Sequence, residues 1–97
     1  GDHVQLMPLS SVGHDVVIGD FVTICPTSSI SGYVIVEEGA FIGTGAHVVN
    51  GLKNRPLIVG RGAYLAAGSV VTKSVPPGAK LAGNPARPLR ELVGRRP

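Results

Sequence analysis

Large aliphatic residues recur every six positions over the first half of the chain, and this repeat restricts the possible folds more than any other feature. The repeating positions are Leu6, Val12, Ile18, Ile24, Ile30, Val36, Ile42 and Val48. Two residues before each stands a second residue, usually small, at Val4, Ser10, Val16, Val22, Ser28, Val34, Ala40 and Ala46. A six-residue step turns a helix position by about 240°, so one helix face cannot hold the repeat. The repeat therefore predicts short strands.

The strands predicted by this repeat are three residues long and have one buried face. Tripeptides 22–24, 40–42 and 46–48 alternate inward, outward and inward, and segments rich in Gly, Pro, Ser and Asp separate them. Such strands cannot pair as hairpins over this length, but they can wind into an all-β solenoid with stacked parallel turns. The six-residue spacing is broken between Val48 and Val59, which are eleven residues apart instead of twelve. This break predicts a loop at about residues 50–57. The repeat stops after residue 76, so residues 1–76 are expected to form the solenoid and residues 77–97 a C-terminal extension, a short tail or helix.

Composition agrees with one small, ordered domain. The chain has 97 residues, 43% of them hydrophobic and mostly aliphatic, which favours packed strands over disorder. The single cysteine, Cys25, cannot form an internal disulfide. No signal segment and no apolar run of roughly 20 residues is found, so a cytoplasmic protein is expected.

Charge is divided unevenly along the chain. Residues 1–52 contain five acids and no Lys or Arg, whereas residues 53–97 contain all nine basic residues and only Glu91 as an acid. One interpretation is a solvated basic tail, formed by Arg87, Arg90, Arg95 and Arg96. The other is contact with a polyanion. No helix-turn-helix, zinc-finger spacing or aromatic platform accompanies these residues, so a phosphate-bearing small molecule is favoured over nucleic acid.

The pattern aliphatic-Gly-x-x-small-x resembles the hexapeptide-repeat acyltransferases. Segments 68–76 and 82–86 look like the closing segment of that family. The run VGHD at 12–15, followed by IGDFV at 18–22, is similar to the branch of sialic-acid O-acetyltransferases and bacterial amino-sugar N-acetyltransferases. This resemblance implies a left-handed parallel β-helix with three hexads per turn, although the general crossover rule favours the right-handed form. It also implies that the chain matches the C-terminal β-helix portion of enzymes that usually carry an N-terminal nucleotide-sugar domain.

The histidine of this motif is the candidate catalytic residue. His14 lies two residues after inward Val12 and two before inward Val16, so its ring is expected to point outward. The resemblance implies that His14 removes a proton from an acceptor hydroxyl or amine as the acceptor attacks the thioester of acetyl-CoA, a role for which imidazole is suited. It further implies that Asp15 orients the ring. Without the motif, both residues would be interpreted as an ordinary surface pair.

The resemblance also implies contacts with acetyl-CoA. Gly32 lies eighteen residues after His14, one turn of a three-hexad coil, so its N–H is expected beside the histidine, where it could hold the thioester oxygen. Thr23 stands where relatives have a second histidine and Met7 where some have a sugar-binding asparagine, which leaves the acceptor open. The other expected contacts are Thr44, Gly45, Ala66, Ala67, Pro85, Arg87 and Arg90, with Lys73 and Lys80 as further candidates.

The predicted function is acetyl transfer from acetyl-CoA to a sugar hydroxyl or amine, either of sialic acid or of a nucleotide-linked amino sugar. The alternative is a non-catalytic trimeric assembly module or a catalytically incomplete fragment. The histidines lack a metal-site spacing, so no metal is expected, and neither is a nucleic-acid or membrane partner. The resemblance implies a homotrimer, in which one flat face that bears outward Val17, Phe21, Ile35, Phe41 or Tyr64 is expected to be buried between subunits.

Overall fold

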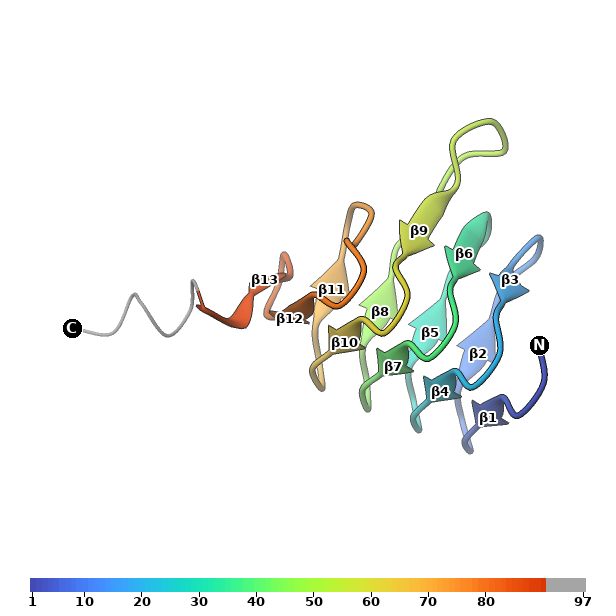
Figure 1. Ribbon diagram of the computed structural model, residues 1–97, viewed down its shortest axis with the longest axis horizontal. Helices are drawn as coiled ribbons and strands as arrows, with labels where there is room; N and C mark the ends of the chain where they lie inside the picture. The colour runs from blue at the N-terminus through green and yellow to red at the C-terminus, as the bar shows by residue number, and fades with distance from the viewer. Residues whose placement is uncertain (91–97) are drawn as a thin grey trace.

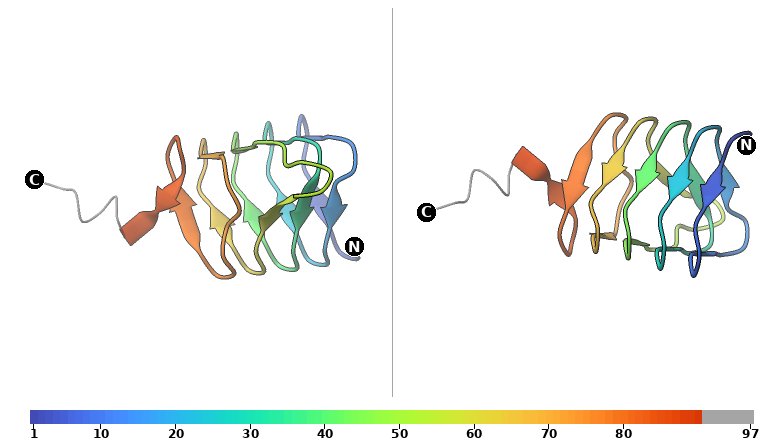
Figure 2. Two further views of the ribbon diagram at one scale, coloured as in Figure 1. Left: turned by 90° about the horizontal axis from the view of Figure 1, so that it is seen from above. Right: turned by 90° about the horizontal axis from the view of Figure 1, so that it is seen from below.

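The six-residue repeat forms a three-sided coil of short strands, seen from the side in Figure 1 and from above and below in Figure 2. The computed structural model describes residues 1–90. Successive turns stack in parallel along the long axis, and each of the first three turns contributes one strand to each side. The last seven residues of the predicted C-terminal extension, which include Glu91, Arg95 and Arg96, lie outside the described residues.

Three sheets make up the sides of the coil. The first sheet contains β1 (Gln5–Leu6), β4 (Thr23–Ile24), β7 (Phe41–Ile42), β10 (Tyr64–Leu65), β12 (Lys80–Ala82) and β13 (Arg87–Pro88). The second sheet contains β2 (Ser11–Val12), β5 (Ser29–Ile30), β8 (His47–Val48) and β11 (Val70–Val71). The third sheet contains β3 (Val17–Ile18), β6 (Val34–Val36) and β9 (Leu57–Val59). All pairings between these strands are parallel except that of β12 with β13.

The register shows where the period holds and where it changes. Ile24 pairs with Ile42, an eighteen-residue step, as three hexads per turn predict. Ile42 pairs with Leu65, a longer step of 23 residues, because the predicted loop leaves the coil between them. Parallel pairing then continues from Leu65 to Leu81. The stacked coil therefore extends to Ala82 instead of ending at residue 76, although the hexad pattern itself stops there.

The core is a column of aliphatic side chains inside the coil. Ile24, Ile42, Leu65, Val48 and Val59 are completely buried, and the alternation predicted for 22–24, 40–42 and 46–48 is confirmed. Burial of such side chains is worth about 1.5–3 kcal/mol each, so the column is the main source of stability. At the first coil this protection is weaker: Leu6 is 56% exposed, because no described coil stacks on its outer side.

Most corners of the coil contain one residue in the left-handed backbone region. Positive φ angles recur at six-residue spacing, first at His3, Leu9, Asp15, Phe21, Thr27 and Tyr33, and then at glycines that include Gly39 and Gly45. At one set of corners, a buried serine stabilises the turn: the Ser28 hydroxyl donates to the Cys25 carbonyl at 2.6 Å. The polar residue at an inward position is thereby satisfied, so it does not weaken the core.

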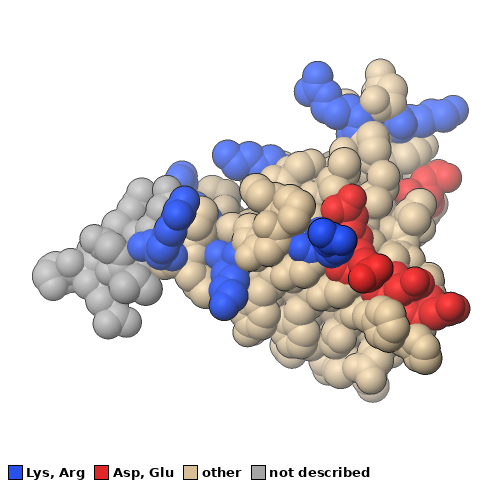
Figure 3. Space-filling view, viewed as in Figure 1, with Lys and Arg blue, Asp and Glu red and all other residues tan. Residues whose placement is uncertain are grey.

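The coil has three edges, and each is a stack of corners. The edge that joins the first sheet to the second is called the Thr44 edge and includes residues 43–46 and 66–69. The edge that joins the second sheet to the third is called the His14 edge and includes residues 13–15, 31–33, 49–56 and 72–74. The acidic edge joins the third sheet to the first and carries Asp20, Glu37 and Glu38. Figure 3 shows the acidic side chains on the right-hand part of this face, and the basic ones mainly toward its top and left with one group beside the acidic side chains. Within residues 1–90 no helix is long and apolar enough to cross a membrane.

Candidate active site

The corner that carries His14 is fixed by its neighbours in the next turn of the coil. The Gly13 N–H donates to the Ile30 carbonyl at 2.7 Å, and the His14 carbonyl accepts from the Tyr33 N–H at 3.2 Å. Asp15 adopts φ of 54°, a conformation that Asp tolerates better than most residues. The corner therefore presents the side chain of His14 outward, as predicted, with 72% of its surface exposed.

Two neighbours hold the imidazole ring in one orientation. His14 Nδ1 lies 3.1 Å from Asp15 Oδ2, and the ring packs edge-on against Tyr33 with centroids 5.1 Å apart. When Nδ1 carries the proton, it donates to the carboxylate and leaves Nε2 as a free acceptor. Asp15 therefore lies where an orienting carboxylate is needed. Both side chains are mostly exposed, so the strength of this contact depends on solvent.

Gly32 lies directly beside the ring, as its eighteen-residue separation from His14 predicts. A Cβ atom at this position would lie 2.9 Å from both Cε1 and Nε2 of His14, closer than real contacts allow. The absence of a side chain is therefore what allows the ring to pack here. Gly32 is buried, and among the described residues no hydrogen bond uses its N–H.

Together these groups can support acyl transfer. A nucleophile bound near Nε2 can lose its proton to His14, while a carbonyl oxygen that gains negative charge can accept from the Gly32 N–H. The sequence predicted His14, Asp15 and Gly32 as one group, and the structure brings them together. The sequence analysis did not predict the contact with Tyr33. The eighteen-residue period could have indicated it, because Tyr33 lies one turn and one position after His14.

Most of the other predicted contacts lie elsewhere on the coil. Thr44, Gly45, Ala66 and Ala67 occupy the Thr44 edge, with the whole second sheet between them and the His14 edge. Thr23 belongs to β4 in the first sheet, and Met7 to a corner of the Thr44 edge. One chain therefore does not bring these residues to His14.

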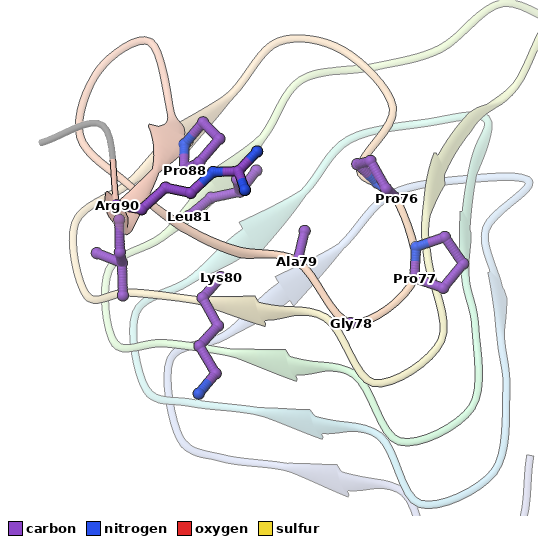
Figure 4. Close-up of a pocket in the computed structure, with 9 residues that line it drawn as sticks. Pro76, Pro77, Gly78, Ala79, Lys80, Leu81, Pro88 and Arg90 are labelled. Carbon is purple, nitrogen blue, oxygen red and sulfur yellow. The ribbon is translucent and has the colours of Figure 1, made fainter.

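The predicted phosphate contacts near the C-terminus are also divided. Arg87 and Pro85 line a pocket with Thr72 and Lys73, next to the His14 edge. Arg90 lines a separate pocket with Lys80, on the side formed by β12 and the corner 76–78 (Figure 4). A phosphate bound by Arg87 would therefore also be near Lys73, which lines the same pocket, and not near Arg90, which lines the other one.

The three histidines do not form a metal site in the part of the chain that the structure describes. His3 stacks on Phe21 with ring centroids 5.0 Å apart, and His47 hydrogen-bonds Ser29 on the second sheet. No group of three or more potential ligand side chains gathers within residues 1–90.

Comparison with known proteins places this geometry in context. GDP-perosamine N-acetyltransferase of Escherichia coli O157:H7 is 52% identical over 81 residues, which cover 84% of this chain and 37% of that protein. The structure of WeeI from Acinetobacter baumannii AYE covers 90% of this chain and 52% of WeeI, with a TM-score of 0.70 and 33% identity. No protein-family profile matches the chain.

A third neighbour supports the fold. AntD, an N-acyltransferase from Bacillus cereus whose mutant was determined with dTDP-4-amino-4,6-dideoxyglucose and coenzyme A, aligns over 95% of this chain and 65% of AntD, with a TM-score of 0.77 and 16% identity. At that identity the likeness concerns the fold alone. The coil is the left-handed parallel β-helix. The chain spans little more than a third of the length of the E. coli relative.

Proposed function

We propose that this chain, which belongs to the hexapeptide-repeat acyltransferases, transfers an acetyl group from acetyl-CoA to the amine of a nucleotide-linked amino sugar. The observation that carries the proposal is the imidazole of His14, oriented by Asp15 and packed beside Gly32, whose N–H is used by no hydrogen bond within residues 1–90. The name of the E. coli relative, an N-acetyltransferase of a GDP-linked sugar, favours an amine over the hydroxyl of sialic acid as acceptor.

The proposed reaction proceeds by direct attack on the thioester. The neutral amine of the acceptor attacks the carbonyl carbon of acetyl-CoA, and His14 Nε2 takes a proton from the nitrogen as the new C–N bond forms. The Gly32 N–H stabilises the negative charge on the carbonyl oxygen. When the C–S bond breaks, the thiolate of CoA leaves and takes the proton from His14, which returns the ring to its neutral form. Asp15 holds the ring and stabilises the transient imidazolium.

The division of predicted contacts between two edges supports a further part of this proposal. If acetyl-CoA contacts both His14 and the small residues of the Thr44 edge, the second set must come from another copy of the chain. A homotrimer meets this requirement, because each gap between neighbouring copies can place one His14 edge opposite one Thr44 edge.

The test is acetyl transfer by the full chain with a panel of nucleotide-linked amino sugars, followed as release of free CoA. The variant His14→Ala is expected to lower turnover by roughly 10²–10⁴-fold, the scale for loss of a positioned base, without weakening CoA binding. His3→Ala, which removes an exposed histidine outside the proposed site, is the matched control and should change turnover by less than about twofold.

Two outcomes would contradict the proposal. An unchanged rate in His14→Ala would remove His14 from the chemistry. CoA release at the rate of the buffer with every acceptor, from a chain that still assembles, would favour the alternative of a non-catalytic assembly module.

A further inference from the structure

The loop that interrupts the repeat is a fixed hairpin at the His14 edge. Its two ends are tied to the turn beside the histidine: the Gly51 N–H donates to the Gly32 carbonyl, and the Leu57 N–H to the Tyr33 carbonyl, both at 3.0 Å. Leu52 and Arg55 exchange two backbone hydrogen bonds of 3.0 Å across the hairpin. Segment 51–56 thus has a defined position relative to His14.

A pocket of about 360 Å³ lies between this hairpin and the corner of the next turn. Its polar lining consists of Asn50, Arg55, Thr72, Lys73 and Ser74, and its apolar part includes Leu57. None of the five acidic residues in the described chain lines the pocket, and neither of its two cations forms an ion pair within residues 1–90. The pocket therefore offers two unpaired positive charges and nearby hydroxyl groups.

We propose that this pocket, the hairpin pocket, binds the diphosphate of a nucleotide ligand. Arg55 can hold two phosphate oxygens at once with its planar guanidinium, and Lys73 supplies a second, more compact charge. The hydroxyls of Thr72 and Ser74 can donate to the remaining oxygens, although Ser74 already accepts a 2.9 Å hydrogen bond from the Ile58 N–H. This inference rests on the proposed function, in which both the acyl donor and the acceptor carry a diphosphate.

The position of the pocket along the coil distinguishes the two sources of diphosphate. The corners of His14, Gly32, Asn50 and Lys73 follow one another on the His14 edge. Adjacent turns are about 4.8 Å apart, so Lys73 lies about 14 Å along the edge from His14. The pantetheine arm of CoA has roughly as many chain bonds as four amino-acid residues, and it spans about 14 Å when extended.

An acceptor sugar fits this separation less well. Only one sugar ring separates the amine of a nucleotide-linked amino sugar from its diphosphate, which is less than the height of three turns. The spacing therefore favours CoA, with its thioester at His14 and its diphosphate in the hairpin pocket. Thr72 and Lys73 also line the neighbouring pocket that contains Arg87, so the row of cations continues toward the C-terminus.

The experiment measures binding directly and so does not depend on turnover. The full chain and the double variant Arg55→Gln/Lys73→Gln are titrated calorimetrically with CoA, pantetheine and GDP. We expect the double variant to weaken CoA binding by roughly ten- to hundredfold, because two charge-assisted contacts are lost, and to leave pantetheine binding within about twofold. The charge-retaining variant Arg55→Lys/Lys73→Arg should lose less affinity for CoA than the double Gln variant, because the charge remains although the bidentate geometry of Arg55 is lost.

Lys53→Gln is the matched control, since Lys53 lies in the same hairpin but does not line the pocket. Its CoA affinity should stay within about threefold of the original. Weakened GDP binding with unchanged CoA binding would support a diphosphate site and assign it to the acceptor. Unchanged affinity for both nucleotides, an equal loss in Lys53→Gln, or failure of the original chain to bind either nucleotide would overturn the proposal.

The outcomes also separate this proposal from the proposed function. If the double variant binds CoA normally while His14→Ala abolishes turnover, only the hairpin pocket is wrong. If the double variant loses CoA affinity while His14→Ala transfers acetyl groups at the original rate, only the catalytic assignment is wrong.

Discussion

The variant Gly32→Ala tests the candidate site most sharply, because it adds one methyl group beside the histidine without changing any polar group. The new Cβ would lie 2.9 Å from Cε1 and Nε2 of His14 and 3.2 Å from its carbonyl oxygen. Ordinary contacts between carbon atoms require about 3.5–4.0 Å, so the ring must move by roughly 0.6–1 Å. A displacement of that size at a reacting group costs about 10²-fold in rate.

Stability should change much less than activity. Gly32 is not among the residues with positive φ, so alanine adds no backbone strain there. The His14 side chain is 72% exposed and can move outward into solvent. We expect a loss below about 1 kcal/mol, which corresponds to a shift in Tm of less than about 8 °C for a chain of this size.

A double-mutant cycle shows whether the loss of activity passes through the ring. Turnover is measured for the original chain, Gly32→Ala, His14→Ala and the double variant, with thermal unfolding of each as the control for folding. In the His14→Ala background no ring remains to be displaced, so Gly32→Ala should lower turnover by less than about twofold. An equal loss in both backgrounds, or a Gly32→Ala enzyme with the original rate, would refute the argument that Gly32 positions His14.

Three further predictions test the ring contact, the core and the assembly. Asp15→Asn should lower turnover by about tenfold in the same assay. This loss is much smaller than the roughly 10⁴-fold loss for a buried triad aspartate, because the side chains of His14 and Asp15 are both mostly exposed. Unchanged turnover would mean that Asp15 is only a turn residue. Ile42→Ala, at a completely buried position, should destabilise the fold by about 2–5 kcal/mol in denaturant unfolding, and a loss below 1 kcal/mol would contradict the central position of the aliphatic column. Val17, Ile35 and Ile58 lie in register on the outer face of the third sheet. If this apolar face forms the subunit contact, Ile35→Asp should convert the proposed trimer to monomers in sedimentation velocity. An original chain that is already monomeric at micromolar concentration would contradict the trimer.

The repeat allowed much of the fold to be predicted because a coil of constant period relates residue number directly to position. Residues six apart occupy equivalent places on successive sides, and residues eighteen apart lie one above the other. For this reason the outward direction of His14 and its contact with Gly32 could both be predicted from sequence spacing. The β-helix handedness could not, since short strands and corners alone are compatible with either sense.

The same relation fails where the period changes, and this explains what the sequence could not predict at the site. One eighteen-residue step beyond Asn50 leads to Gly68, which lies on the Thr44 edge. Because the hairpin lengthens this turn to 23 residues, Lys73 takes the place next to Asn50 instead. The insertion thus brings a lysine of the basic half of the chain onto the His14 edge and adds Arg55 beside it. If the hairpin pocket holds a diphosphate, deletion of residues 51–55 should restore the eighteen-residue period, leave Lys73 in its turn without Arg55, and weaken CoA binding at least as much as Arg55→Gln alone. CoA affinity equal to that of the original chain, in a deletion variant with unchanged thermal unfolding, would show that the insertion serves another purpose.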